Sequence, residues 1–220
     1  MRSLLEVRCY ILLFVLVITI SGCVKQRSNA ELPVLGRSDI QEIMVNGNIT
    51  YDTTFHTIAD FSFINQDSAI VTNETFHDKI YVADFFFTTC PTICPIMKTQ
   101  MLRVYDHFKE NDQVMFLSHT IDPDHDTVAL LHDFAERLGV SSDKWHFVTG
   151  QKEAIYEIGQ HSYIVTAMES KDEPGGYLHS GAFILVDRDR RIRGLYDGTS
   201  EEDIDRLIHD IPKLLKEYDI

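Results

Sequence analysis

The chain has 220 residues, of which 44% are hydrophobic and 25% are charged. This length fits one globular domain with appended segments, and the composition allows a sizeable core. The formal net charge of −14 disfavours a nucleic-acid partner, because nucleic-acid phosphates would be repelled.

The first 22 residues are predicted to be a lipoprotein signal peptide. Arg2 and Arg8 precede the apolar run YILLFVLVITI, whose eleven residues are fewer than the ~20 that a membrane-spanning helix needs. The run ends in ISGC, which resembles the bacterial lipobox, in which the cysteine is lipidated and becomes the first mature residue. We therefore expect Cys23 to anchor a lipoprotein to a membrane of the bacterial cell envelope, facing the periplasm or the outside. An uncleaved anchor and an ordinary secretory signal are the alternatives.

Residues 23–50 are expected to form a linker, because residues 24–48 are polar and show no clear period. The remaining residues, 51–220, are expected to form one domain. In chain order the patterns predict a hairpin over 59–72, a buried strand at 79–87, a helix over 95–110, a strand at 114–121, a helix over 127–140, a strand at 145–149, a short helix over 152–161, a loop at 170–176, a hairpin around 188–190 and a helix over 200–218.

This order predicts an α/β fold. Strands that alternate with helices favour a parallel core, and the late hairpin adds antiparallel edges, so we expect a central mixed sheet flanked by helices and preceded by an N-terminal hairpin. Ser200 is expected to cap the last helix, whose first turn is acidic.

Cys90 and Cys94 are the two cysteines that remain when Cys9 is removed with the signal peptide and Cys23 is lipidated. They directly follow the buried strand at 79–87 and open a helix, an arrangement typical of thioredoxin-like folds. A helix that begins near 91–93 would place both sulfurs on one face, and its N-terminus would lower thiol pKa values. The pair could be a structural disulfide, a redox couple or a metal clamp.

Three residues separate the two cysteines, which leaves room for a metal between the sulfurs. Soft thiolates favour Cu(I), whereas zinc would need further donors to reach its usual four ligands. His179 is the candidate third ligand, because it immediately precedes the strand GAFILVD and the residues before that strand pack against the dithiol in a thioredoxin-like fold; a purely structural histidine is the alternative. Other histidines are expected on helix surfaces or as core residues with hydrogen-bond partners: His107, His132 and His209 in the first group, His119 and His146 in the second.

Taken together, these motifs resemble the Sco/SenC family of copper-binding, thioredoxin-like proteins. The resemblance rests on DFFFTTCPTICPIM, TIDPDHDT at 120–127, TG at 149–150 and YLHSGAFILVD at 177–187, and it covers about residues 57–215. It implies that Cys90, Cys94 and His179 bind copper, as Cu(I) or Cu(II). It also implies a role in assembling the binuclear copper centre of cytochrome c oxidase, by delivering copper or by reducing the cysteines of the recipient.

The sequence departs from the family pattern at two places. The residues between the cysteines include no aspartate, and Thr89 stands where histidine is common, so redox tuning and the recipient can differ.

Expected partners are the copper-centre subunit of an oxidase or another copper enzyme, and a thiol reductant. Asp122 is a candidate partner of the metal ligands rather than a ligand itself, or simply the start of a turn before Pro123. The alternative function is a thiol-disulfide oxidoreductase with Cys90 as the nucleophile.

Overall fold

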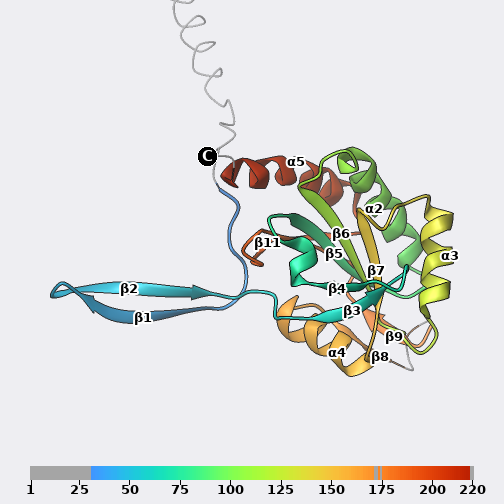
Figure 1. Ribbon diagram of the computed structural model, residues 1–220, viewed down its shortest axis with the longest axis horizontal. Helices are drawn as coiled ribbons and strands as arrows, with labels where there is room; N and C mark the ends of the chain where they lie inside the picture. The colour runs from blue at the N-terminus through green and yellow to red at the C-terminus, as the bar shows by residue number, and fades with distance from the viewer. Residues whose placement is uncertain (1–30, 171–172, 174, 219–220) are drawn as a thin grey trace, which may run out of the picture. The chain divides into compact units, whose positions relative to one another are not determined.

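The structure, a computed structural model, describes residues 31–170, 173 and 175–218. Its centre is a seven-stranded sheet with the strand order β11-β10-β5-β6-β7-β3-β4 (Figure 1). The β5–β6 and β6–β7 pairs are parallel, and the remaining pairs are antiparallel. The predicted mixed sheet with flanking helices is therefore confirmed. Residues 1–22 and Cys23, predicted as the signal peptide and the lipidation site, lie outside the described residues.

The predicted elements occur in the predicted order, and the structure adds a further N-terminal hairpin, the short helix η1 and the β8–β9 pair. The strands of the large sheet are β3 (Ser62–Asn65), β4 (Ile70–Thr72), β5 (Ile80–Phe86), β6 (Val114–Thr120), β7 (Trp145–Thr149), β10 (Ala182–Val186) and β11 (Ile192–Asp197), and a small sheet pairs β8 (Ala167–Glu169) with β9 (Tyr177–His179). The helices are η1 (Asn73–Phe76), α2 (Cys94–Phe108), α3 (Val128–Leu138), α4 (Lys152–Glu157), the π-helix η2 (Ile158–Ser162) and α5 (Glu201–Tyr218).

Helical segments cover both faces of the sheet. Phe85 and Phe86 are neighbours in β5, so their side chains point to opposite faces. The Nζ atom of Lys98, in α2, lies 4.1 Å from the centroid of the Phe86 ring. A Cβ atom added to Gly159, in η2, would lie 3.1 Å from the Phe85 ring. Because both faces are covered, every residue of β5 is buried, as its continuous apolar run predicts.

A separate hairpin precedes the sheet and corrects part of the linker prediction. It consists of β1 (Ser38–Val45) and β2 (Asn48–Phe55), which pair along their whole length (Figure 1). Asn46 and Gly47 form its turn with φ values of 53° and 80°, and Asn-Gly favours such two-residue turns. Only the first half of β2 alternates polar with apolar side chains, β1 has no period of two, and nearly every residue of both strands is exposed, so the sequence of the hairpin resembles that of a linker.

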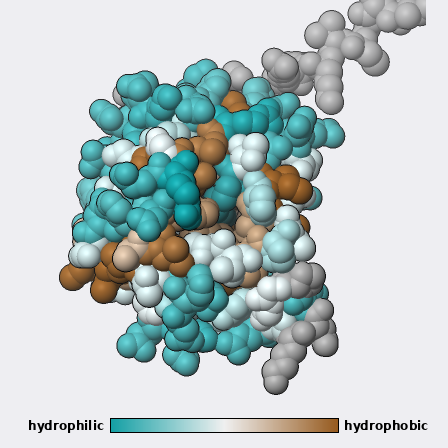
Figure 2. Space-filling view, turned by 90° about the vertical axis from the view of Figure 1, so that its right-hand side faces the viewer, coloured by the Kyte–Doolittle hydropathy of each residue, from teal (hydrophilic) through white to brown (hydrophobic). Residues whose placement is uncertain are grey.

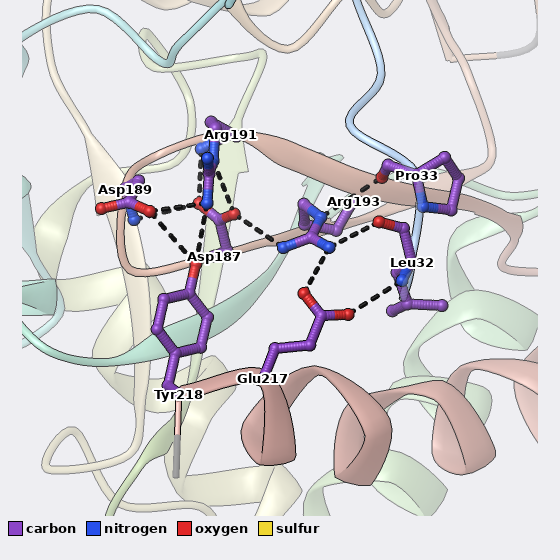
Figure 3. A network of polar contacts seen from close by, with 8 residues as sticks. All are labelled: Leu32, Pro33, Asp187, Asp189, Arg191, Arg193, Glu217 and Tyr218. Carbon is purple, nitrogen blue, oxygen red and sulfur yellow. Dashed lines mark hydrogen bonds and ion pairs between the residues drawn. The ribbon is translucent and has the colours of Figure 1, made fainter. Parts of the chain in front are cut away.

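The segment before this hairpin is attached to the domain by a polar network. The buried guanidinium of Arg193, in β11, donates hydrogen bonds to the backbone carbonyl groups of Leu32 and Pro33 and to the carboxylate of Glu217, in α5 (Figure 3). Glu217 in turn accepts a hydrogen bond of 2.8 Å from the backbone N–H of Leu32. The folded domain therefore begins before residue 51, the boundary that the sequence predicts.

The surface is largely polar where the space-filling view shows it. The face on the right of Figure 1, where α3 lies, is mostly hydrophilic and carries separate hydrophobic patches (Figure 2). Within residues 31–170, 173 and 175–218, no helix combines the length and the apolar character that crossing a bilayer requires.

His119, in β6, is a fully buried histidine without hydrogen bonds. Neither of its ring nitrogens has a partner among the described residues, so the expected partners are missing. Burial disfavours the charged imidazolium and lowers the pKa of His119 to about 3. Its neighbours are four aromatic rings: Phe61, Phe63, Phe85 and Tyr163.

This histidine is expected to make the protein less stable in acid. The unfolded chain binds a proton at His119 near pH 6.5, whereas the folded protein does so only near pH 3. Because the unfolded state then binds more protons, this contribution to the free energy of unfolding is complete above pH 6.5 and falls by roughly 1.4 kcal/mol per pH unit below it. Between pH 7 and pH 5, the free energy of unfolding in urea should decrease less for His119→Phe than for the wild type. Equal decreases in the two proteins would contradict the prediction.

Candidate metal centre

Cys90 and Cys94 lie at the start of α2, beyond the carboxyl end of β5. Cys94 is the first residue of the helix, and the first helical hydrogen bond runs from the backbone N–H of Met97 to the carbonyl of Ile93, 2.9 Å apart. The helix therefore begins later than the predicted 91–93. Pro95 lies in its first turn, where its missing N–H costs nothing. Cys90 stays in the preceding loop, with its backbone N–H bonded to the carbonyl of Phe87 at 3.3 Å.

His179 reaches the two cysteines from a distant part of the chain. It is the last residue of β9, and its register partner in β8 is Ala167. Its Nε2 atom lies 3.3 Å from the Sγ atom of Cys94 and 3.9 Å from that of Cys90. The three ligand atoms all lie within 4.8 Å of one another, and the three residues are only 5–8% exposed.

The two thiols lie in different electrostatic surroundings. Burial alone would raise the pKa of Cys90, but hydrogen bonds from the backbone N–H groups and the side chains of Thr92 and Cys94 together outweigh it, so the pKa of Cys90 lies below its ordinary value. Burial dominates at Cys94 and raises the pKa of that thiol. Both cysteines are free thiols in the structure. Cys90 is therefore the sulfur that ionises first.

The imidazole of His179 is suited to act as a neutral ligand. Burial lowers the pKa of His179, which favours the uncharged ring. The Nδ1 atom lies 3.3 Å from the backbone carbonyl of Ser180. When Nδ1 carries the proton and donates it to that carbonyl, Nε2 presents its lone pair to the two sulfurs.

This donor set fits a soft first-row metal ion. An ion with bonds of about 2.0 Å to nitrogen and 2.3 Å to sulfur separates these donors by about 3.5–3.7 Å. The two observed S–N distances, 3.3 and 3.9 Å, lie on either side of that range. Two thiolates and one imidazole can provide three-coordination, which suits Cu(I) better than the four-coordination that zinc prefers.

Asp122 does not belong to this donor cluster. Its buried carboxylate instead accepts a hydrogen bond of 2.7 Å from the hydroxyl of Tyr177, two residues before His179 in β9. Asp126, two residues before α3, is also buried and contacts the loop that carries Cys90. Neither contact can be read from sequence spacing, because each joins residues far apart in the chain.

A buried ion pair lies one helical turn beyond Cys94. The Nζ atom of Lys98 is 2.7 Å from the carboxylate of Asp84, in β5, and 3.1 Å from the hydroxyl of Ser118, in β6. The indole N–H of Trp145 donates to the same hydroxyl at 2.9 Å. The sequence does carry a signal for this pair, since Asp84 interrupts an apolar run and Lys98 falls on the buried face of α2.

Three solved structures resemble this chain throughout the domain. A SCO1/SenC family lipoprotein from Bacillus anthracis is 28% identical, with a TM-score of 0.67 over 73% of this chain and 95% of its own. BsSco, described as a member of the Sco family of cytochrome c oxidase assembly proteins, is 30% identical, with a TM-score of 0.64 over 72% and 93%. Arabidopsis thaliana ScoI with copper bound is 28% identical, with a TM-score of 0.61 over 73% and 98%. These likenesses confirm the thioredoxin-like fold.

The family can be assigned from the sequence match as well. The SCO1/SenC family model matches residues 50–216, a range that includes Cys90, Cys94 and His179. Because this match spans well over half of the chain, the protein belongs to the SCO1/SenC family.

Proposed function

We propose that this protein binds one copper ion through Cys90, Cys94 and His179 and supplies it to the copper centre of a cytochrome c oxidase or another copper enzyme. The observation that carries the proposal is the approach of His179 Nε2 to both sulfurs, at 3.3 and 3.9 Å. The copper-bound state of the Arabidopsis relative and the assembly role of BsSco support it.

The chemistry of the site makes copper binding dependent on the redox state of the cysteines. The thiolate form of each cysteine is the ligand, so Cys94, whose pKa is raised, must release its proton when the metal binds. A Cys90–Cys94 disulfide would have no thiolate to offer. A thiol reductant is therefore required whenever the pair has been oxidised to the disulfide.

The proposal includes a membrane anchor. The ISGC sequence at 20–23 supports lipidation of Cys23, and the Bacillus anthracis relative is a lipoprotein. Anchored in this way, the protein belongs to the cell envelope, where it meets a recipient on the same membrane. Mass measurement of the mature protein tests this part, since lipidation predicts that the chain starts at Cys23 and carries added acyl mass.

An anaerobic copper titration tests the proposed function directly. The reduced protein is expected to bind one equivalent of Cu(I), and the same protein oxidised to the Cys90–Cys94 disulfide is expected to bind none. The measurement is the metal-to-protein ratio after gel filtration, with Cys94→Ser as the variant that lacks one sulfur. A stoichiometry below one in the fully reduced wild type would reject the proposal.

The alternative, a thiol-disulfide oxidoreductase that reduces the recipient's cysteines, is tested in parallel. Such an enzyme needs Cys90 and Cys94 but no imidazole ligand. A peptide that carries the recipient's cysteines as a disulfide serves as its substrate. Rapid reduction of this peptide, together with no copper binding by the reduced protein, would favour the alternative.

A further inference from the structure

The turn between β6 and α3 holds the loop that carries Cys90. Asp126, in this turn, is fully buried, and its carboxylate accepts hydrogen bonds from the backbone N–H of Thr88 at 3.0 Å and from the Thr88 hydroxyl. The hydroxyl of Thr120 donates to it at 2.5 Å, and the Nδ1 atom of His125 lies 3.0 Å away. Because Thr88 is two residues before Cys90, Asp126 fixes the chain where it leaves β5 toward the first sulfur.

The same turn holds the strand that carries His179. The carboxylate of Asp122 accepts the hydroxyl hydrogen bond of Tyr177, at 2.7 Å. Tyr177 and His179 are two residues apart in β9, so their side chains lie on the same side of the strand. A restraint on the Tyr177 side chain therefore limits how far the imidazole can move from the sulfurs.

The two carboxylates belong to one hydrogen-bonded turn. The backbone carbonyl of Asp122 accepts from the N–H of Asp126 at 2.8 Å and from that of His125 at 3.1 Å. The hydroxyl of Thr120 accepts from the backbone N–H of Asp122 at 3.1 Å while it donates to the Asp126 carboxylate. The turn is thus closed on itself and can hold both attached segments at a fixed separation.

Phe87 completes the connection between the two halves of the site. It lies between Phe86 and Thr88, directly beyond β5, and its ring centroid is 5.1 Å from that of Tyr177. The same ring meets His179 at 5.8 Å with an interplanar angle of 83°, an edge-to-face contact. Phe87 therefore contacts both Tyr177 and His179, and it joins the strand that carries His179 to the loop that carries Cys90.

We propose that Asp122 and Asp126 are positioning residues that hold the two halves of the copper site at binding distance. Asp126 positions the cysteine loop through Thr88, and Asp122 positions His179 through Tyr177. Neither carboxylate is a metal ligand in this arrangement. The inference rests on the proposed function, because copper affinity is its main measure.

Tyr177→Phe is the sharpest test, because it removes one hydroxyl and leaves the ring against Phe87. The Cu(I) affinity of the reduced full-length protein, measured by competition with a chromophoric chelator, is expected to fall about tenfold, which is typical for loss of an outer partner of a metal ligand. Asp122→Ala should cause a similar loss. Asp122→Asn keeps an oxygen that can accept from Tyr177 and should stay close to the wild type.

Tyr196→Phe is the matched control. Tyr196, in β11, donates a hydrogen bond of 3.1 Å to the carboxylate of Asp210, in α5, and it is buried. Tyr177→Phe and Tyr196→Phe therefore each remove a tyrosine hydroxyl that donates a hydrogen bond to an aspartate. Tyr196→Phe is expected to leave Cu(I) affinity unchanged. If Tyr177→Phe binds copper as tightly as Tyr196→Phe, or if Asp122→Asn loses as much affinity as Asp122→Ala, the positioning role is rejected.

A readout without metal separates this inference from the proposed function. In the reduced apo protein, nuclear Overhauser contacts between the rings of His179 and Phe87 should weaken in Tyr177→Phe and persist in Tyr196→Phe. If the wild type binds no copper, the proposed function fails, and the His179–Phe87 contacts alone decide whether Asp122 positions His179. Contacts that weaken only in Tyr177→Phe would then uphold the positioning role, and contacts that persist in both variants would overturn it.

Discussion

Replacing His179 by alanine is expected to lower the Cu(I) affinity of the reduced protein by more than about 100-fold. The substitution removes one of three donors, and loss of a partner outside the ligand set already costs 10–100-fold in typical metal sites. The imidazole is 3.3 Å from one sulfur and 3.9 Å from the other, and no other residue of the described chain joins this cluster of potential ligands. Chelator competition under anaerobic conditions measures the change.

The same variant should leave the apo fold nearly intact. The buried ring of His179 has an edge-to-face contact with Phe87 and lies 3.3 Å from the Ser180 carbonyl, so the free energy of unfolding should fall by about 2 kcal/mol while the domain stays folded. His107→Ala is the control, because His107 is exposed on α2. An unchanged Cu(I) affinity in His179→Ala would remove the basis of the copper proposal. Retained reduction of a disulfide peptide by this variant would then favour the oxidoreductase.

Replacing Lys98 by methionine is expected to destabilise the protein by about 3–5 kcal/mol, because it leaves the carboxylate of Asp84 charged and buried without its partner. The pair is 2.7 Å apart, and neither side chain is more than 6% exposed. The ammonium group also lies 4.1 Å from the centroid of the Phe86 ring, so a cation–π contact is lost as well. Urea unfolding of the reduced apo protein measures the loss.

Two comparisons make this result specific to the buried pair. Asp84→Asn combined with Lys98→Met removes both charges and should recover most of the lost stability, because no uncompensated charge remains. Lys109→Met breaks an ion pair with Asp106 on the exposed end of the same helix and should have little effect. A Lys98→Met variant as stable as Lys109→Met would show that the pair contributes nothing beyond a surface contact.

The central elements could be predicted because their signals are local. The run IYVADFF of β5 is apolar except for Asp84, and the structure buries it on both faces. Ser200 was expected to cap α5, and its hydroxyl accepts a hydrogen bond of 3.3 Å from the backbone N–H of Asp203. The β1–β2 hairpin escaped prediction although Asn46–Gly47 is a strong turn signal, because its strands are too polar on average to suggest a sheet.

The start of α2 shows a second limit of local patterns. The two Cys-Pro pairs suggest a helix from about residue 91, because proline suits a first helical turn at either place. The structure begins the helix at Cys94, so Cys90 lies in a loop and its sulfur is placed by backbone hydrogen bonds rather than by helical spacing. Spacing alone does not decide which of the two prolines opens the helix.

The candidate site could be predicted only in part. The cysteine pair is a local motif, whereas the approach of His179 joins residues 85 positions apart and follows from the order of the strands in the sheet. The contacts of Asp126 with Thr88 and of Asp122 with Tyr177 span 38 and 55 positions. Because such contacts depend on how loops at one edge of the sheet meet, residue type and spacing do not reveal them.

The bond network around Arg193 has a practical consequence for making a soluble fragment of this protein. A fragment truncated at residue 51 would delete Leu32 and Pro33, whose backbone oxygens accept hydrogen bonds from a guanidinium that is only 4% exposed. Its remaining protein acceptors would be Glu217 and Asp187. A start at Glu31 keeps these contacts, so the choice of first residue decides whether the buried guanidinium of Arg193 keeps its two backbone acceptors.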